Sequence, residues 1–193
     1  MNDFIKLYKM DDISICDRII EEFENSQNQQ AGVVIDQYGN LNVNKEIKDS
    51  INIDYPYGSV NTIFSEFKGQ LRKALSYYVT EFVYSNRGAP WTITESVTVQ
   101  KYLPGGGFKA WHYERLNAVL PSAARHLVFL AYLNDVTDEG ETEFYYQKVK
   151  IKAQKGTIAI WPVDWTHTHR GIPSPSQIKY VIGGWLNYYD PSL

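Results

Sequence analysis

The sequence contains little cysteine: Cys16 is the single one among 193 residues. One cysteine cannot form an internal disulfide, so the pattern excludes a small secreted domain held by disulfides and favours a reducing compartment. The first 30 residues lack the apolar core of a secretory signal, and no run approaches the roughly 18 apolar residues of a membrane helix. We therefore expect a cytoplasmic protein that does not span a membrane.

An excess of basic charge is also lacking. The chain has 19 lysines and arginines against 22 aspartates and glutamates, which gives a net charge of −3. This balance argues against nucleic acid or an anionic membrane as the main partner. A chain of this length can bury about 70% of its unfolded surface in one core, and no linker divides it. We expect a single domain over residues 1–193.

Helical periodicity is confined to the first 90 residues. Asp11 and Asp12 are candidate N-cap residues for a helix whose apolar stripe ends at Phe23. A second and longer helix is predicted from Asn61 to Tyr84, because apolar residues recur there at helical spacing. Residues 31–60 indicate loops and short strands. We therefore assign residues 1–90 to helical support.

The period changes after Pro90. Threonine, valine, isoleucine and tyrosine dominate several segments that are bounded by Gly, Asn, Asp or Pro, and these predict strands over 91–103, 127–133, 143–146, 157–161 and 178–188. Helices followed by strands indicate an α+β protein whose second half, residues 91–190, forms a sandwich or small barrel.

His112 and Glu114 form the first motif with ligand chemistry. In a strand, residues i and i+2 face the same side, so the two side chains could grip one ion together. A second imidazole from a later strand would complete a set of two histidines and one carboxylate, which leaves three metal positions open and is typical of non-haem Fe(II) oxygenases. Zinc accepts the same ligands. The plainer alternative is a solvated pair on a surface strand.

The second imidazole has two candidates, His167 and His169, which share strand parity. The residues alone do not choose between them. His126 precedes an apolar strand, and we interpret it as a structural histidine.

Lys179 lies in an otherwise apolar strand. On a period of two it shares a face with Val181, Gly183 and Trp185, and neither face of the strand is plainly exposed to solvent. A lysine in such a strand lies either on a sheet edge or inside a barrel, where its ammonium must be paired. A dicarboxylate would supply the anion.

Taken together, these residues resemble a known family, the Fe(II)- and 2-oxoglutarate-dependent dioxygenases, in the prolyl 4-hydroxylase-like branch and its small single-domain phage or bacterial form. The resemblance extends from about Val97 to Tyr188. Its ordered positions are Tyr102, His112, Glu114, Arg125, Tyr132, Gly140, Thr142, Phe144, Gly156, His169, Gly171, Pro173, Lys179 and Trp185. It implies a double-stranded β-helix of jelly-roll or cupin-like form, with N-terminal supporting helices.

The resemblance also implies a role for individual residues. His112, Glu114 and His169 would be the iron ligands, and His169 is selected because Gly171, Pro173 and Lys179 fall at the family's offsets only from it. His167 would then be a neighbour of the site. The implied cosubstrate residues are Lys179 for the distal carboxylate of 2-oxoglutarate, helped by Tyr102 and Thr142, with Trp185 beside the pocket.

The implied activity is hydroxylation of a prolyl or other residue of a peptide or protein, with release of succinate and CO2. The cofactors would be Fe(II) and 2-oxoglutarate, with ascorbate as a candidate reductant, and the location would be the host cytoplasm for a phage-encoded chain. The alternatives are the same chemistry on a free amino acid or small molecule, and a jelly-roll binding module without catalysis. One position departs from the branch, which mostly has aspartate where this chain has Glu114.

Overall fold

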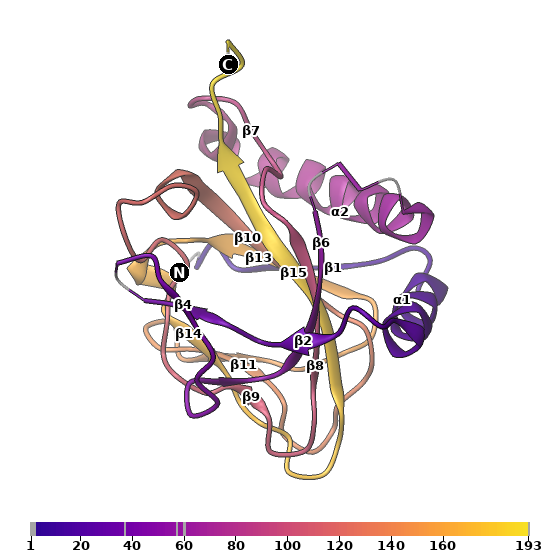
Figure 1. Cartoon of the computed structure of the whole chain (residues 1–193). Coiled ribbons are helices and arrows are strands. Elements are labelled where there is room, and N and C mark those ends of the chain that lie inside the picture. Colours follow the sequence, from indigo (N-terminus) through magenta and orange to yellow (C-terminus); the bar gives the residue numbers. More distant parts are fainter. Residues whose placement is uncertain (1–2, 37, 57, 60, 193) are drawn as a thin grey trace.

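The computed structural model describes residues 3–36, 38–56, 58–59 and 61–192. A sheet of eight strands forms its centre, in the order β1-β13-β10-β15-β8-β6-β2, with β7 paired to β15 (Figure 1). The neighbouring strands are antiparallel. The strands of this large sheet are β1 (Lys6–Lys9), β2 (Gln30–Ala31), β6 (Ile51–Tyr55), β7 (Trp91–Thr92), β8 (Val97–Tyr102), β10 (Arg125–Tyr132), β13 (Thr157–Pro162) and β15 (Lys179–Tyr188).

A smaller sheet of three strands has the order β12-β11-β14. Two further strand pairs, β3 with β4 and β5 with β9, complete the β structure of the described residues. These strands are β3 (Val34–Ile35), β4 (Leu41–Asn42), β5 (Lys48–Asp49), β9 (Gly107–Phe108), β11 (Thr142–Phe144), β12 (Val149–Ile151) and β14 (His169–Gly171). The helices are α1 (Ser14–Asn25) and α2 (Thr62–Glu81), with short 3-10 turns η1 (Val83–Asn86), η2 (Ser122–Ala124) and η3 (Trp165–His167).

The central strands of the large sheet are buried on both faces. Along β10, Phe129 packs in a core shared with the helices. Its neighbours Val128 and Tyr132 pack in a second core, which includes Phe144 and Ile151 of the small sheet. Alternate residues of one strand therefore serve two cores. Two antiparallel sheets that enclose one core, with helices outside, confirm the predicted α+β double-stranded β-helix.

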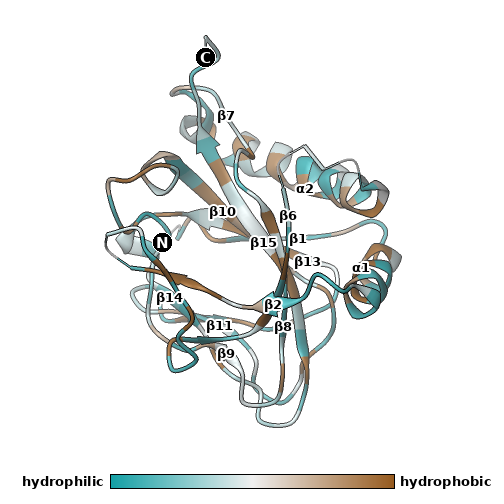
Figure 2. Cartoon of the chain, in the orientation of Figure 1, coloured by the Kyte–Doolittle hydropathy of each residue, from teal (hydrophilic) through white to brown (hydrophobic). Residues whose placement is uncertain are grey.

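The helices cover the outer face of the large sheet (Figure 1). Hydrophobic and hydrophilic residues alternate along both of them in Figure 2. The ring of Phe67 on α2 lies 6.1 Å from that of Phe129, centroid to centroid. The predicted cap of the first helix is wrong by one position: Ile13 is the N-cap and makes no side-chain bond, although Asp12 accepts a hydrogen bond from the amide of Ser14. None of the helices within the described residues is long and apolar enough to cross a bilayer.

The N-terminal region is more than helical support. Strand β1 pairs with β13, and β6 pairs with β8, so both belong to the large sheet. Strand β1 begins at Lys6, two residues after Phe4, whose backbone is left-handed with φ of 58°. The strands near residues 48–55 are short and have a mixed pattern, in a segment where the sequence indicated loops and short strands.

Replacing Phe67 by alanine is expected to lower the free energy of unfolding by about 3–5 kcal/mol, because it leaves a cavity between α2 and the large sheet. Urea denaturation followed by circular dichroism measures the change. Tyr84 is 86% exposed, so Tyr84→Ala is the matched control and should change stability by less than about 0.5 kcal/mol. Equal losses in the two variants would contradict this packing.

Candidate metal centre

A backbone bridge brings two histidines together. The amide of His112 donates to the carbonyl of His169 at 2.9 Å, and the amide of His169 donates back to the carbonyl of His112 at 2.9 Å. His169 begins β14 in the small sheet, whereas His112 lies outside the named strands. The imidazole centroids are 4.3 Å apart. The bridge therefore places both rings on the inner side of the small sheet.

Glu114 completes the cluster. Its Oε1 lies 3.2 Å from Nε2 of His169 and 3.6 Å from Nε2 of His112. All three side chains can offer one ligand atom within 4.8 Å of the others. The main chain of Glu114 is held where its amide donates to the carbonyl of Val163 at 3.0 Å.

The structure corrects one step of the sequence argument. His112 and Glu114 were expected on one strand, where a spacing of two puts side chains on the same face. His112 instead forms an isolated bridge, and Glu114 lies in a bend. The two side chains converge because the chain turns between two hydrogen-bonded positions.

Each imidazole presents the same nitrogen to the cluster. Nδ1 of His112 lies 2.9 Å from the carbonyl oxygen of Ala110, and Nδ1 of His169 lies 2.9 Å from that of His167. A carbonyl can only accept, so Nδ1 carries the proton and donates in both rings. Nε2 of each ring therefore faces Glu114, where it can donate to the carboxylate when protonated and bind a cation when it is not, which is the orientation that metal-binding histidines have.

The pKa values of the cluster agree with this arrangement. Burial opposes the charged form of Glu114, but hydrogen bonds and charge interactions with His112 and His169 outweigh it and hold the carboxyl pKa well below its usual range. Burial, together with the neighbouring His169, lowers the pKa of His112. A charged carboxylate beside a neutral imidazole is the state that binds a cation.

Trp185 holds the second oxygen of Glu114. Its Nε1 donates to Oε2 at 3.0 Å. The guanidinium of Arg125 stacks on the Trp185 ring at 3.5 Å and donates through Nη1 to the main-chain carbonyl of Glu114 at 2.8 Å. Glu95 neutralises Arg125 through two hydrogen bonds, of 2.9 and 2.6 Å. The expectation that Trp185 lies beside the pocket is therefore extended: it also orients a candidate ligand.

These three residues fit a metal ion. Protein nitrogens and oxygens bind such ions at roughly 2.0–2.2 Å, so adjacent ligand atoms lie about 3 Å apart. The separations from Glu114 Oε1, 3.2 Å and 3.6 Å, are close to that spacing. Two nitrogens and one oxygen from one side leave the other positions open for exogenous ligands.

Lys179 is buried in the same cavity, at 5% exposure. It begins β15 opposite Tyr102, and its Nζ donates to the carbonyl of Gly140 at 3.0 Å. Nζ also lies 5.2 Å from the centroid of the Tyr102 ring. Burial lowers the pKa of Lys179 to about 8, although the charge of Glu141 opposes that shift. Within the described residues no carboxylate forms an ion pair with it, so an anion is missing from its surroundings.

The cavity between the sheets has a volume of about 120 Å³. At about 30 Å³ per water molecule, it has room for a small dicarboxylate. Tyr102 and Thr142 also line it; the Tyr102 hydroxyl donates to Gln100, and the Thr142 hydroxyl accepts from Tyr132. All the site residues predicted from the sequence border this one space: His112, Glu114, His169, Tyr102, Thr142, Lys179 and Trp185.

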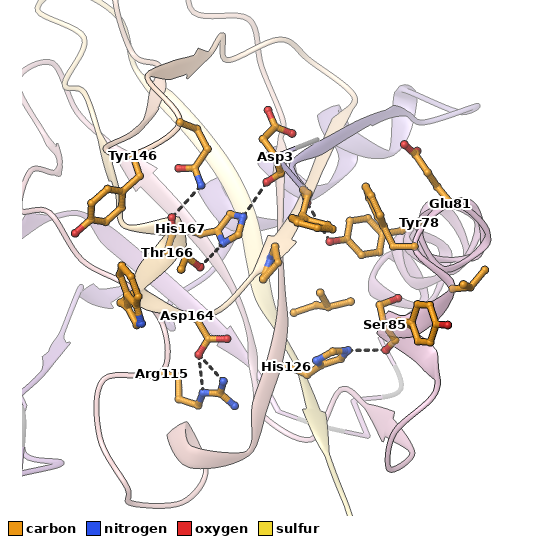
Figure 3. A pocket seen from close by; sticks show the side chains of 18 of the residues that line it. Asp3, Tyr78, Glu81, Ser85, Arg115, His126, Tyr146, Asp164, Thr166 and His167 are labelled. Atoms are coloured by element: carbon orange, nitrogen blue, oxygen red, sulfur yellow. Dashed lines mark hydrogen bonds and ion pairs between the residues drawn. The ribbon is translucent and has the colours of Figure 1, made fainter. Parts of the chain in front are cut away.

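His167 faces a different space. Its Nε2 lies 2.9 Å from the carbonyl oxygen of Asp3 (Figure 3), and its ring borders a larger cavity of about 1140 Å³ between η3 and the C-terminal part of α2. Only its main-chain carbonyl contacts the cluster, through Nδ1 of His169. His126 borders that larger cavity too, where its Nε2 lies 2.8 Å from the carbonyl oxygen of Ser85, as expected for a structural histidine.

Two residues of the cavity wall escaped the sequence analysis. The Phe108 ring stacks on His112 with centroids 3.5 Å apart. Lys48, on β5, is buried at 9% exposure and lines the same cavity. Burial lowers the pKa of Lys48, against the opposing charges of Glu114 and Asp54. Lys48 lies in a segment whose apolar residues have no clear periodicity, so the sequence pattern did not indicate that its side chain is buried.

Loss of any one of the three ligands is expected to weaken metal binding by at least about 100-fold, since even outer partners of a ligand contribute 10–100-fold. The variants are His112→Ala, Glu114→Ala and His169→Ala, measured by anaerobic titration with Fe(II) and by Mn(II) calorimetry. His167→Ala is the control and should bind within about threefold of the unmodified protein. The assignment is wrong if His167→Ala loses the metal and His169→Ala keeps it.

Comparison with solved structures shows the same fold. A viral collagen prolyl hydroxylase from Paramecium Bursaria Chlorella virus-1, in complex with 2-oxoglutarate, superposes with a TM-score of 0.67 at 17% identity, over 96% of this chain and 97% of that chain. A prolyl-4-hydroxylase from Pseudomonas putida gives a TM-score of 0.69 at 11% identity, over 96% and 93%. A Trichoplax adhaerens prolyl hydroxylase, in complex with a hypoxia inducible factor peptide fragment, gives 0.68 at 17%, over 97% and 84%.

No curated protein matches the chain in sequence. The sequence model of the 2OG-Fe(II) oxygenase superfamily matches residues 97–187, which include all three candidate ligands and Lys179. Over these residues the chain is similar to the 2OG-Fe(II) oxygenase superfamily, and its fold is that of the prolyl 4-hydroxylases.

Proposed function

We propose that this chain is a 2-oxoglutarate-dependent dioxygenase that hydroxylates a prolyl residue of a peptide or protein, with Fe(II) held by His112, Glu114 and His169. The observation that carries the proposal is a buried ammonium without a carboxylate partner, Lys179, in the same small cavity as an open set of three ligands. A metal site alone would fit many reactions. A metal site with a cation placed for a dicarboxylate fits 2-oxoglutarate.

The bound iron and cosubstrate supply O2 activation coupled to oxidative decarboxylation of 2-oxoglutarate. One oxygen atom of O2 enters succinate and the other enters the substrate, so that R–H, O2 and 2-oxoglutarate give R–OH, succinate and CO2. The chain's own residues provide binding and orientation. Lys179 pairs with the distal carboxylate of 2-oxoglutarate, and Tyr102 and Thr142 line the space around it.

The walls of the cavity keep the site dry and the ligands in place. Trp161 and Phe144 pack against His169, with ring centroids 5.0 and 5.4 Å away. Both side chains are fully buried. Trp185 keeps Glu114 from rotating, because it binds the oxygen that does not face the histidines. Exclusion of water protects a reactive oxidant from side reactions.

Exposed aromatic residues beside the metal centre support a peptide substrate. Trp111 precedes His112 and contacts Tyr145 edge to face at 5.1 Å; Tyr145, Tyr146 and Trp165 continue the row with centroids 5.1 and 5.7 Å apart. Their exposed fractions run from 39% to 59%. Aromatic surfaces of this kind bind extended, proline-rich segments. The Trichoplax prolyl hydroxylase, which has the same fold, is in complex with a peptide fragment.

The same chemistry on a free amino acid or small molecule is the second candidate. Such a substrate would react at the same set of three ligands and would not need the exposed aromatic row. We also propose a cytoplasmic location, supported by one buried, unpaired cysteine, Cys16, and ascorbate as the reductant that keeps the iron reduced.

Succinate formation tests the function directly. With Fe(II), ascorbate and 2-oxoglutarate, we expect decarboxylation that rises when prolyl peptides from an array are added, and mass spectrometry should find a gain of one oxygen on proline. Glu114→Asp is expected to retain activity, because the carboxylate survives. Complete loss in Glu114→Asp would show that the hydrogen bond to Trp185 requires the longer side chain. No decarboxylation under any condition would mean a binding module.

Lys179→Ala is expected to weaken 2-oxoglutarate binding by about 100-fold to several thousand-fold, since loss of one partner of a buried charge pair costs about 3–5 kcal/mol. Iron affinity should stay nearly unchanged. Lys179→Arg should lose less, because the charge survives. Titration of 2-oxoglutarate into the Fe(II)-loaded protein under argon measures the difference. Equal affinities in Lys179→Ala and the unmodified protein would remove the physical basis of the cosubstrate site.

The pH dependence follows from the same lysine. Its pKa in the protein without cosubstrate is about 8, so the ammonium is present below that pH and lost above it. We expect 2-oxoglutarate affinity to be level between about pH 6 and pH 7.5 and to fall by up to about tenfold per pH unit above about pH 8. Lys179→Ala should lack the decline.

The unfolded lysine, near pKa 10.4, binds more protons over this range, so Lys179 makes folding more favourable as pH rises from about 8 to 10.

A further inference from the structure

Lys48 is a second buried ammonium in the cavity of the metal centre. Its side chain is 9% exposed and lines the space that holds His112, Glu114 and His169. Among the described residues its Nζ makes no hydrogen bond and no ion pair. Nζ lies over the ring of Phe108, 5.5 Å from its centroid. The proposed reaction does not use the charge of Lys48.

The backbone fixes Lys48 relative to the metal ligands. Strand β5 pairs with β9 so that Lys48 lies opposite Phe108. The carbonyl of Ile47 accepts a hydrogen bond from the amide of Lys109 at 2.7 Å. The Phe108 ring in turn stacks on His112, with centroids 3.5 Å apart. Lys48 therefore belongs to the wall beside the ligand set.

With Fe(II) and 2-oxoglutarate bound, the charges in the cavity would not balance, and one negative charge would be missing. Its lining carries two ammonium groups, Lys48 and Lys179, against one carboxylate, Glu114. Fe(II) and dianionic 2-oxoglutarate have equal and opposite charges, so loading the site leaves one positive charge in excess. Asp54 interacts with Lys48 through charge, but it does not line the cavity, and its carboxylate accepts hydrogen bonds from Thr98 and Gln30.

We propose that Lys48 binds a carboxylate of the substrate and so determines specificity, selecting a substrate with an anionic group close to the carbon that is hydroxylated. This inference rests on the proposed function, because it assumes that Lys179 and the metal already hold the two ends of 2-oxoglutarate. The carboxylate has two sources: the α-carboxylate of a free amino acid or C-terminal residue, or an acidic side chain beside the target residue.

Acetate tests the carboxylate site without any assumption about the substrate. In the protein loaded with Mn(II) and saturating 2-oxoglutarate, acetate bound at Lys48 lies close to the paramagnetic ion. We expect strong Mn(II)-induced relaxation of the acetate methyl protons by NMR, and at least about threefold less in Lys48→Met. Acetamide, which has the same shape and no charge, should show only the weak effect of the bulk solution.

Matched variants show whether the acetate effect depends on Lys48 itself or on any lysine of this segment. Lys45 lies on the same segment with a side chain 71% exposed, so Lys45→Met should behave like the unmodified protein. Lys48→Arg should keep the acetate effect. The 2-oxoglutarate affinity of Lys48→Met should stay within about twofold. A loss of tenfold or more there would assign Lys48 to the cosubstrate and overturn the proposal.

The comparison of acetate with acetamide in the unmodified protein needs no variant, so it holds even if Lys48→Met fails to fold. Equal relaxation for the two probes would overturn the proposal. The acetate effect does not depend on turnover: its presence without succinate formation would refute the proposed function and leave the carboxylate site standing. If the acetate effect is absent and turnover is normal, the carboxylate site is refuted and the proposed function stands.

Paired substrates identify the source of the carboxylate. L-proline against L-prolinamide tests the free amino acid, and acetyl-Gly-Pro against its amide tests a C-terminal residue. Blocked peptides with Pro-Asp against Pro-Asn test a neighbouring acidic side chain. In at least one pair the carboxylate member should be preferred by about tenfold in kcat/KM, and Lys48→Met should reduce that ratio to about twofold or less. No preference in any pair would overturn the proposal.

Discussion

The structure depends on a sheet that is buried on both faces for different reasons. One face of β10 and β15 packs against α1 and α2 through residues such as Phe129 and Ile182, and this apolar core supplies the stability. The opposite face can therefore carry groups that do not help folding. Lys179 and the cavity near Trp185 lie on that second face. Burying an ammonium without a carboxylate partner costs free energy, and the helices and the first core offset that cost.

The two-sided burial of β15 could be predicted from the sequence, because side chains alternate between the two faces of a strand. Lys179, Val181 and Trp185 share a face because side chains alternate along any strand, and the structure confirms that neither face of β15 is open to solvent. The convergence of His112 with Glu114 could not be derived in the same way. It arises from a long-range backbone bridge to His169, and periodicity within a segment does not contain information about which distant segment will pair with it.

Glu114, where the family branch mostly has aspartate, is held in place by contacts with neighbouring residues. The glutamate directs Oε1 toward both histidines and gives Oε2 to Trp185, while Arg125 binds its main-chain carbonyl. Arg125 is one of the ordered positions of the family resemblance, and its place in the sequence gives it no physical role by itself. Its guanidinium is enclosed by Glu95 and the Trp185 ring. A fully paired arginine of this kind fixes the indole, and the indole fixes the ligand, so a longer carboxylate side chain does not mean a looser one.

The N-terminal segment takes part in the site although the family match starts at residue 97. The carbonyl of Ile47 accepts the amide of Lys109, and also that of Ala110 at 3.4 Å. The carbonyl of Ala110 then accepts from Nδ1 of His112. Hydrogen bonds therefore connect Ile47, the residue before β5, through Ala110 to the ring of His112. The segment that brings Lys48 to the cavity therefore also holds Ala110, whose carbonyl orients the His112 ring, so the proposed substrate contact and the metal centre depend on neighbouring hydrogen bonds.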